Sequence, residues 1–334
     1  MATMGVVMTE AIRWGILGTG GIADAFATDL VSNGFRVTAV GSRSQDSADA
    51  FAAKFEIANA HDSYEALAAD PEVDVIYVAT PHPYHVANAT LALEHGKHVL
   101  VEKPFTLNAA EAAGVVALAE EKGLVVLEAM WTRWLPHIVR LREIIAAGTI
   151  GEVRTVIADH NQNLPKDPSH RLQNPALGGG ALLDLGIYPV SFAWDILGAP
   201  ATVHAISSPT PTGVDRQTAI LLGYENGAQA VLHTALDTAG PNTASVIGTG
   251  GWVAIDKTFY APTSFTVYNA DNEVVETYVS EVSNRGMQYQ AWEAERLIAA
   301  GVTAGDILSP AETVAIMGTL DEVRRQIGLV YPGE

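Results

Sequence analysis

Short apolar runs and helical stretches alternate through the first 130 residues of the chain. The helical signals are clearest between Asn108 and Gly123, because Asn108 can cap a helix, Glu111 follows three residues later, and Gly123 can end it. This alternation predicts a parallel sheet with helices on both faces, whose ligands bind beyond the carboxyl ends of the strands. The apolar runs that we expect to form strands are residues 12–17, 35–41, 73–79, 97–101 and 124–129.

The pattern changes after about residue 150, where strand-like runs follow one another with few helices between them. Asn226 and Gly227 form the strongest short hairpin signal of this half. We therefore expect an α/β Rossmann domain over residues 11–130 and an α+β domain with a mostly antiparallel sheet over residues 131–334. The expected strands are residues 155–162, 217–224, 228–236, 244–250, 251–256 and 264–270. Helices are expected near residue 180 and over residues 287–300 and 310–327, and the last two can pack back on the first domain.

The composition excludes several classes of protein. Hydrophobic residues make up 48% of the 334 residues and charged residues 17%, which is typical of a globular chain of about two domains. The formal net charge of −19 disfavours binding to nucleic acid or to anionic membranes. Cysteine is absent, so disulfides, thiolate catalysis and cysteine-ligated metals are excluded. Because no apolar run reaches ~18 residues and the N-terminus shows no secretory pattern, we expect a cytoplasmic protein.

A glycine-rich turn follows the first expected strand and precedes an expected helix. Gly18, Gly20 and Ala23 form the pattern G-x-G-x-x-A, which also encloses Gly21 and Ile22. Such a turn brings backbone amides and a helix N-terminus to a pyrophosphate. We expect this segment to bind a dinucleotide, although the pattern alone also fits a purely structural turn.

The end of the second expected strand discriminates between NAD and NADP. An acidic residue at this place would bind the ribose 2′-hydroxyl of NAD, but the chain has Ser42 and Arg43, and the nearest acid is Asp46. A hydroxyl and a guanidinium suit a 2′-phosphate. We therefore expect NADP rather than NAD, although Arg43 also fits a solvated loop residue.

The stretch HVLVEKPFTL, residues 98–107, ends an apolar run in Glu102, Lys103 and Pro104. Charges and proline are good at ending strands, so these residues have a purely structural interpretation. If the strand belongs to the parallel sheet, its carboxyl end faces the ligand and Lys103 acquires a chemical role.

Several motifs carry a family resemblance in their order and spacing. The segments GILGTGGIA, VIYVATPHPYHVANATLALEHGKHVLVEKPFTLN and GGGALLDLGIYPV resemble those of the Gfo/Idh/MocA oxidoreductases. The segment LVVLEAMWTRWLP is most similar to the branch that holds dimeric dihydrodiol dehydrogenase and NADP-dependent D-xylose dehydrogenase. The resemblance extends from about residue 12 to about residue 328. It implies a Rossmann domain followed by an open-faced antiparallel sheet, with the active site between them.

The resemblance also implies roles for particular residues. It places Lys103 of the E-K-P segment beside the nicotinamide, with a Lys–Pro bond that is commonly cis, and it makes Asp184 and Tyr188 active-site residues. The residues that it places along the cofactor are Thr80, His82, His85, Glu102, Lys103, Trp131 and Arg133.

Oxidation of a secondary alcohol requires removal of a hydride, which the cofactor accepts, and of a proton, which the protein must take. Asp184 and Tyr188 are four residues apart on an expected helix and so share one face. A nearby ammonium lowers the pKa of a tyrosine, and Lys103 is the candidate. We therefore expect Tyr188 to transfer the proton with help from Lys103. A buried core tyrosine and a helix-internal hydrogen bond of Asp184 are the structural alternatives.

Substrate contacts are harder to assign from the sequence. Arg171 lies in a proline-rich loop and could anchor a polar substrate, as could His160 or Asn161, but an exposed loop arginine fits equally well. The spacing of His61, His82 and His85 matches no zinc pattern, so we expect no metal site.

The leading function is an NADP-dependent oxidoreductase that acts on a sugar, cyclitol or diol. One alternative is an enzyme that retains NAD and cleaves glycosides through transient oxidation, and another is a non-enzymatic NADP-binding regulator of the same fold. An uncovered apolar sheet face would mark an interface, so we also expect a homodimer or a higher homo-oligomer.

Overall fold

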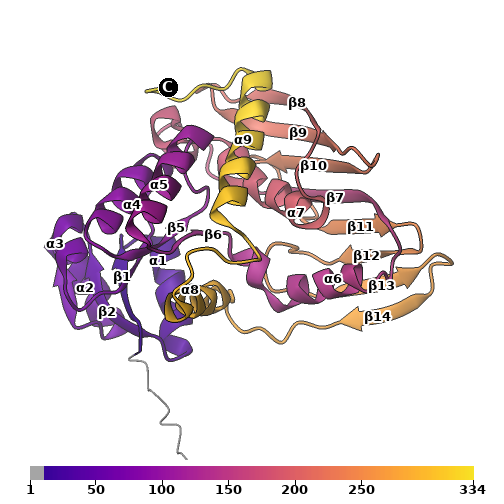
Figure 1. Ribbon diagram of the computed structural model, residues 1–334. Coiled ribbons are helices and arrows are strands. Elements are labelled where there is room, and N and C mark those ends of the chain that lie inside the picture. Colours follow the sequence, from indigo (N-terminus) through magenta and orange to yellow (C-terminus); the bar gives the residue numbers. More distant parts are fainter. Residues whose placement is uncertain (1–10) are drawn as a thin grey trace, which may run out of the picture.

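Two β-sheets, one in each half of the chain, organise the computed structural model, which describes residues 11–334 (Figure 1). The expectation about the N-terminal sequence rests mainly on residues 1–10, which lie outside the described residues. The first sheet is parallel, and its strand order is β3-β2-β1-β4-β5-β6. Its strands are β1 (Arg13–Leu17), β2 (Arg36–Gly41), β3 (Asn59–His61), β4 (Val75–Val78), β5 (His98–Glu102) and β6 (Val126–Ala129).

Helices pack against this first sheet, and their sequences explain where they begin and end. The side chain of Asn108 accepts a hydrogen bond from the Glu111 amide at 2.9 Å, and Gly123 adopts the left-handed conformation just past the helix end, as expected. The central strand β4 is wholly buried, which matches its continuous apolar sequence. The helices are α1 (Gly21–Ser32), α2 (Gln45–Phe55), α3 (Tyr64–Ala69), α4 (His85–Glu94) and α5 (Ala109–Lys122).

The second sheet has the strand order β14-β13-β12-β11-β7-β10-β9-β8 and is antiparallel except where β7 pairs with β10. The expected hairpin is present, because β9 and β10 are joined through Asn226 and Gly227. Its strands are β7 (Val153–Asn161), β8 (Thr202–Pro209), β9 (Asp215–Gly223), β10 (Gln229–Ala235), β11 (Ala244–Gly248), β12 (Gly251–Ile255), β13 (Phe265–Asn269) and β14 (Val274–Tyr278).

Helices cover the face of the second sheet that is turned toward the first domain (Figure 1). Helix α7 (Ile187–Leu197) packs on β7 and β10, and α6 (Pro136–Ala146) lies beside it. Helix α8 (Gln288–Ala300) contacts α1, and α9 (Pro310–Ile327) lies against α5. The last two helices therefore join the two halves of the chain.

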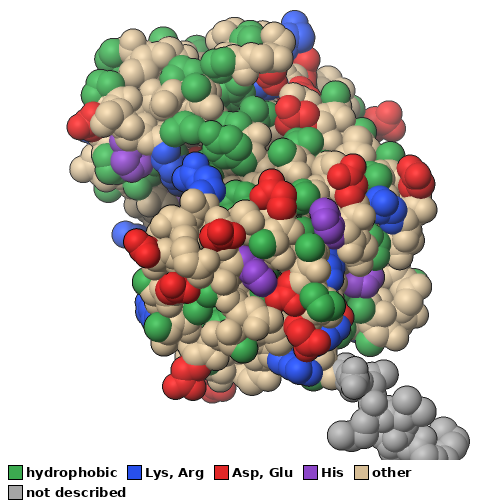
Figure 2. Space-filling view, turned by 90° about the vertical axis from the view of Figure 1, so that its left-hand side faces the viewer, with side chains coloured by type: hydrophobic (Ala, Val, Ile, Leu, Met, Phe, Trp, Pro, Cys, Tyr) green, Lys and Arg blue, Asp and Glu red, His purple; other side chains and the backbone are tan. Residues whose placement is uncertain are grey.

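The surface and the core agree with a mixed-charge globular chain. On the face shown in Figure 2, acidic and basic side chains alternate with apolar ones and do not merge into one broad basic area. One stretch of the described chain, Pro175–Leu197, is long and apolar enough to cross a membrane, but 89% of its apolar window is buried inside the protein. This stretch includes α7, whose apolar residues pack in the core beneath the second sheet.

Candidate active site

A cavity of about 550 Å³ lies between the two domains at the carboxyl ends of the parallel strands. Both halves of the chain contribute to its walls, so it forms only when the two domains pack together. The residues expected from the sequence that line it are Gly20, Gly21, Ile22, Thr80, His82, Glu102, Lys103, Trp131, His160, Arg171, Asp184 and Tyr188.

The glycine turn forms one end of this cavity and provides room for a phosphate. Gly18 has φ of +109°, and a Cβ at this position would lie 3.0 Å from the carbonyl oxygen of Ala79, so only glycine fits the tight turn. Gly20 and Gly21 face open space, and α1 begins at Gly21. The exposed backbone and the positive end of the helix therefore fit a dinucleotide pyrophosphate.

Ser42 and Arg43 lie at the end of β2, next to the glycine turn but outside the main cavity. The hydroxyl groups of Thr19 and Ser42 are 3.4 Å apart, which links the two segments. Arg43 is exposed and lies beside Tyr64, whose pKa is raised by burial and lowered in part by the guanidinium. This corner presents hydroxyl groups and an arginine beyond the phosphate-binding turn.

Lys103 points into the cavity from the end of β5, and the Lys103–Pro104 peptide bond is cis, as the family resemblance implied. Its Nζ donates a hydrogen bond to the backbone carbonyl of Asp184 at 2.7 Å, and it lies 3.7 Å from Oδ1 of the same residue. Burial by itself lowers the pKa of Lys103, but its acidic neighbours, Asp184 first and then Tyr188 and Glu102, outweigh this effect and raise it. The lysine is therefore an ammonium group at neutral pH.

Asp184 is the centre of the charged side of the cavity. It lies in a π-helical turn, Leu182–Gly186, that precedes α7. Its Oδ1 accepts a hydrogen bond from Arg171 Nη2 at 3.1 Å and lies 3.6 Å from Nε2 of His82. Burial alone raises the pKa of Asp184, but Lys103, Arg171 and His82 outweigh it and hold the pKa below its usual range. The carboxylate stays ionised and orients the cations around it.

Tyr188 lies beside Lys103, near the start of α7. Its hydroxyl oxygen accepts a hydrogen bond from Nε1 of Trp131 at 3.0 Å, and Nζ of Lys103 lies 5.0 Å from the centre of its ring. Burial raises the pKa of Tyr188, while Lys103 and Trp131 act in the opposite direction. The expected lowering by Lys103 is therefore present, but burial dominates and the phenol is protonated at neutral pH.

Stacked aromatic rings form the remaining wall. The rings of His160 and Tyr260 stack with centroids 3.7 Å apart, and Tyr260 lies 5.0 Å from Tyr188. Nδ1 of His160 lies 3.2 Å from the Leu185 carbonyl, and its Nε2 accepts from the Gln162 amide at 2.8 Å. Burial lowers the pKa of His160 to about 3, so this imidazole is neutral and serves as a fixed platform.

His82 and His85 have different roles in the loop after β4. His82 lines the cavity, with Nδ1 3.1 Å from the Gly178 carbonyl, and burial lowers its pKa to about 3. His85 lies behind the cavity, where its two ring nitrogens are 2.8 and 2.9 Å from the carbonyl oxygens of Thr80 and Pro104. His85 therefore ties the Thr80 loop to the Lys103–Pro104 segment from behind.

Besides Ser42, Arg43 and His85, the expected site residues Arg133 and Asn161 do not line the cavity either. Arg133 is buried and pairs with Asp195 at 3.2 Å and Glu312 at 2.8 Å, because a residue two positions after Trp131 in a 3₁₀ turn points away from it. Asn161 donates to Asp159 at 2.8 Å, since neighbouring residues on β7 point to opposite faces and His160 faces the site. Both side chains stabilise the scaffold around the cavity.

Three further lining residues have no local sequence signal. Gln162 directly follows β7, Tyr260 lies in the loop after β12 and Arg285 in the loop after β14, and all three reach the cavity. Tyr260 forms part of the aromatic wall, and the Gln162 amide donates a hydrogen bond to its hydroxyl. Arg285 lines the same cavity, as do Gly20 and Gly21 of the glycine turn. Only the tertiary arrangement brings these segments to the first domain.

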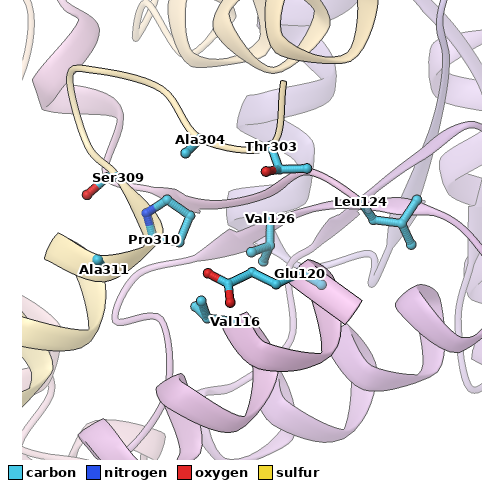
Figure 3. Close-up of a pocket in the computed structure, with 10 residues that line it drawn as sticks. Val116, Glu120, Leu124, Val126, Thr303, Ala304, Ser309, Pro310 and Ala311 are labelled. Atoms are coloured by element: carbon cyan, nitrogen blue, oxygen red, sulfur yellow. The ribbon is translucent and has the colours of Figure 1, made fainter. Parts of the chain in front are cut away.

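A second, smaller cavity of about 100 Å³ lies away from this site, between α5 and the start of α9 (Figure 3). Aliphatic side chains such as Val116, Leu124 and Val126 form much of its lining, and Glu120 is its charged residue. It brings together no pair of acid and base groups. This smaller cavity therefore has no counterpart to the acid and base groups around Lys103.

The fold and this cavity define a two-domain, NAD(P)-binding oxidoreductase. A family model described as "Oxidoreductase family, NAD-binding Rossmann fold" matches residues 12–130, and one described as "GFO/IDH/MocA C-terminal domain" matches residues 138–254. The chain belongs to the GFO/IDH/MocA oxidoreductase family, which confirms the resemblance found in its motifs.

Similar proteins share this architecture along nearly their whole length. The chain is 38% identical over 331 residues to trans-1,2-dihydrobenzene-1,2-diol dehydrogenase of Mus musculus, covering 96% of this chain and 98% of the relative. It is 36% identical over 365 residues to D-xylose 1-dehydrogenase (NADP(+)) of Hypocrea jecorina, covering 96% and 93%. The 3-ketoreductase KijD10 of Actinomadura kijaniata, solved with NADP and TDP-benzene, superimposes with a TM-score of 0.84 at 26% identity, covering 95% and 98%.

Proposed function

We propose that the chain transfers a hydride between NADP and a secondary alcohol or carbonyl group of a sugar, cyclitol or diol. The observation that carries this proposal is the convergence of Lys103, Asp184 and Tyr188 in the cavity that also contains the glycine turn. The names of the relatives, a diol dehydrogenase and a sugar dehydrogenase, support the same class of substrate.

The bound nicotinamide supplies the hydride acceptor or donor. Tyr188 is the proposed proton-transfer residue, because its hydroxyl oxygen already accepts from Trp131 and its own O–H is left to point at the substrate oxygen. In reduction the phenol donates this proton, and in oxidation the phenolate takes it back. Lys103 stabilises the phenolate through its charge, and Asp184 holds the lysine in place.

The walls of the cavity suit a ring with a polar edge and an apolar face. Arg171, Asp184 and Lys103 present charged hydrogen-bonding groups on one side. Tyr260 and His160 present stacked ring faces on another, which fit the C–H face of a sugar or the ring of a cyclic diol. We propose that Arg171 and His160 contact the substrate, Arg171 by hydrogen bonding and His160 as part of the aromatic wall.

Preference for NADP is the finer part of the proposal. Ser42 and Arg43 replace the acid that would bind a free ribose 2′-hydroxyl, and the guanidinium is exposed beside the glycine turn. An arginine at this place favours a 2′-phosphate through charge-assisted hydrogen bonds.

A homodimer through the second sheet is also proposed. Leu221, Val231 and Ile157 are direct neighbours across three strands, and each is more than 40% exposed. They lie on the face opposite α7, which no helix of residues 11–334 covers in Figure 1. An apolar row of this kind on an open sheet favours pairing with a second copy.

One experiment tests the reaction and separates it from glycoside cleavage. Aldoses, polyols and diols are incubated with NADP⁺ and with NAD⁺, and the absorbance of reduced nicotinamide is followed. The proposal predicts stoichiometric NADPH from a free sugar or diol. Glycoside cleavage without net NADPH, with nucleotide retained by the protein, would overturn it. A cytoplasmic location remains a prediction.

A further inference from the structure

A tight turn from the second half of the chain, residues 284–287, is fixed onto helix α1 of the first domain. The buried carboxylate of Asp29 accepts a hydrogen bond from the backbone amide of Met287 at 2.7 Å. Burial raises the pKa of Asp29, and the backbone amide of Arg285 and the side chain of Asn284 face the same carboxylate and act in the opposite direction. Asp29 thus anchors a turn that lies more than 250 residues away in the sequence.

The conformation of this turn leaves little freedom for the residue between its anchors. Asn284 has φ of +55° and Gly286 has φ of +74°, so both residues that flank Arg285 adopt the left-handed conformation. A Cβ on Gly286 would lie 2.6 Å from Leu135, which holds the turn from its other side. The position of the Arg285 backbone is therefore set by the first domain as well as by its own segment.

Arg285 lines the cavity together with Gly20 and Gly21. Within residues 11–334, its guanidinium forms no ion pair or side-chain hydrogen bond, although most arginines of the chain are paired with carboxylates. The open glycine backbone and the N-terminus of the 12-residue helix α1 lie in the same cavity. An unpaired guanidinium and a helix N-terminus both favour an anion between them.

We propose that Arg285 binds the pyrophosphate of the dinucleotide and that Asp29 positions it for this contact. The inference rests on the proposed function, because it assigns a further residue to the same NADP site. The two segments close on the phosphates from opposite domains, so nucleotide binding also ties the second half of the chain to α1. Arg43 at the other end of the nucleotide would contact the 2′-phosphate instead.

The test measures nucleotide binding directly, by isothermal titration calorimetry on the full chain without substrate. The ligands are NADP⁺, NAD⁺ and 2′-AMP, which carries the 2′-phosphate but no pyrophosphate. Arg285→Ala is expected to raise the Kd of NADP⁺ and NAD⁺ by about tenfold each and to leave that of 2′-AMP unchanged. Arg285→Lys keeps the charge but loses the forked pair of donors of the guanidinium. Its Kd values for NADP⁺ and NAD⁺ should lie between those of wild type and Arg285→Ala.

Two control variants make this pattern specific. Arg43→Ala is expected to raise the Kd of NADP⁺ and of 2′-AMP but not that of NAD⁺. The two ligands it affects are those that carry a 2′-phosphate, whereas Arg285→Ala affects the two that carry a pyrophosphate. Arg36→Ala removes an exposed charge at the amino end of β2 and should change none of the three. The inference is overturned if Arg285→Ala binds NADP⁺ and NAD⁺ like wild type, or if it weakens 2′-AMP equally. Wild type that binds neither NADP⁺ nor NAD⁺ would instead defeat the proposed function itself.

The positioning role of Asp29 has its own test, a double-mutant cycle. Asp29→Ala removes the acceptor that holds the Met287 amide. This variant should raise the Kd of NADP⁺ severalfold when Arg285 is present, and it should leave that Kd unchanged in the Arg285→Ala background. An equal effect in both backgrounds would show that Asp29 acts only on stability.

Discussion

The ammonium of Lys103 donates a 2.7 Å hydrogen bond to the backbone carbonyl of Asp184. This bond joins the end of β5 in the first domain to the π-helical turn before α7 in the second. It leaves the Asp184 carboxylate to Arg171 and sets the lysine charge 5.0 Å from the centre of the Tyr188 ring. The residues proposed for proton transfer are thus held in place by a contact between domains.

Replacing Lys103 tests the role of this charge. In Lys103→Met the side chain keeps similar length but loses its ammonium, so the Tyr188 phenolate loses its nearest cation. We expect kcat to fall at least about a hundredfold, with the Kd of NADP⁺ nearly unchanged. Lys103→Arg, which keeps the charge, should retain more activity than Lys103→Met. A kcat within about threefold of wild type for Lys103→Met would contradict the assignment.

The Trp131 indole tunes Tyr188 through its 3.0 Å hydrogen bond. In Trp131→Phe this donor is lost, the phenolate is less stabilised, and the pKa of Tyr188 rises further. The pH profile of kcat/KM for alcohol oxidation should therefore shift to more alkaline pH. Trp134→Phe is the matched control, because Nε1 of Trp134 is buried without a hydrogen-bond partner in the described chain. A shift of equal size in both variants would show a packing effect only.

Glu128 gives a prediction about stability. It is buried, its Oε1 accepts from the Phe105 amide at 3.1 Å, and burial raises its pKa to about 7. Between pH 4.5 and 7 the unfolded chain loses this proton while the folded chain keeps it, so stability falls as the pH rises.

Glu128→Gln removes this dependence. As the pH rises from 4.5 to 7, the free energy of unfolding of Glu128→Gln should increase relative to that of wild type by about 3 kcal/mol. The measurement is urea unfolding at each pH. Exposed Glu120→Gln is the control and should track wild type. Parallel curves for wild type and Glu128→Gln would refute the assignment.

The apolar row on the second sheet predicts the oligomeric state. Wild type should have a dimeric mass by light scattering at micromolar concentration, and Val231→Lys should shift it toward the monomer, because a charge in the middle of the row opposes burial. Glu225→Lys is the control, since this exposed residue lies in the hairpin turn between β9 and β10. A monomeric mass for wild type would contradict the proposed interface.

Local motifs explain how much of the architecture could be predicted. Each of three features occupies only a few consecutive residues: the glycine turn, the end of β5 and the pair Asp184 and Tyr188. Their chemistry can therefore be predicted from the sequence. The edge strands β8 and β14 were not expected, because their half-exposed residues form no buried apolar run. Helix α6 and the three-residue strand β3 were missed as well, the latter because it is short and polar.

The site itself was only partly predictable for a different reason. Arg285 and Tyr260 lie in loops, and nothing near them in the sequence indicates that they meet the first domain. Arg133 illustrates the converse, since its motif is present but its side chain turns to Asp195 and Glu312. The pKa of Tyr188 is another example. Burial raises this pKa, and the sequence pattern does not show how deeply the side chain is buried.

The central claim is that Tyr188 transfers the proton, and the Tyr188→Phe variant tests it most directly. The measurement is kcat for alcohol oxidation with NADP⁺ across pH, beside calorimetric binding of NADP⁺. In wild type kcat should rise with pH as the phenol ionises. In Tyr188→Phe it should be at least about a hundredfold lower and lack that rise, with NADP⁺ bound as in wild type. A variant whose kcat equals that of wild type across pH would contradict the account.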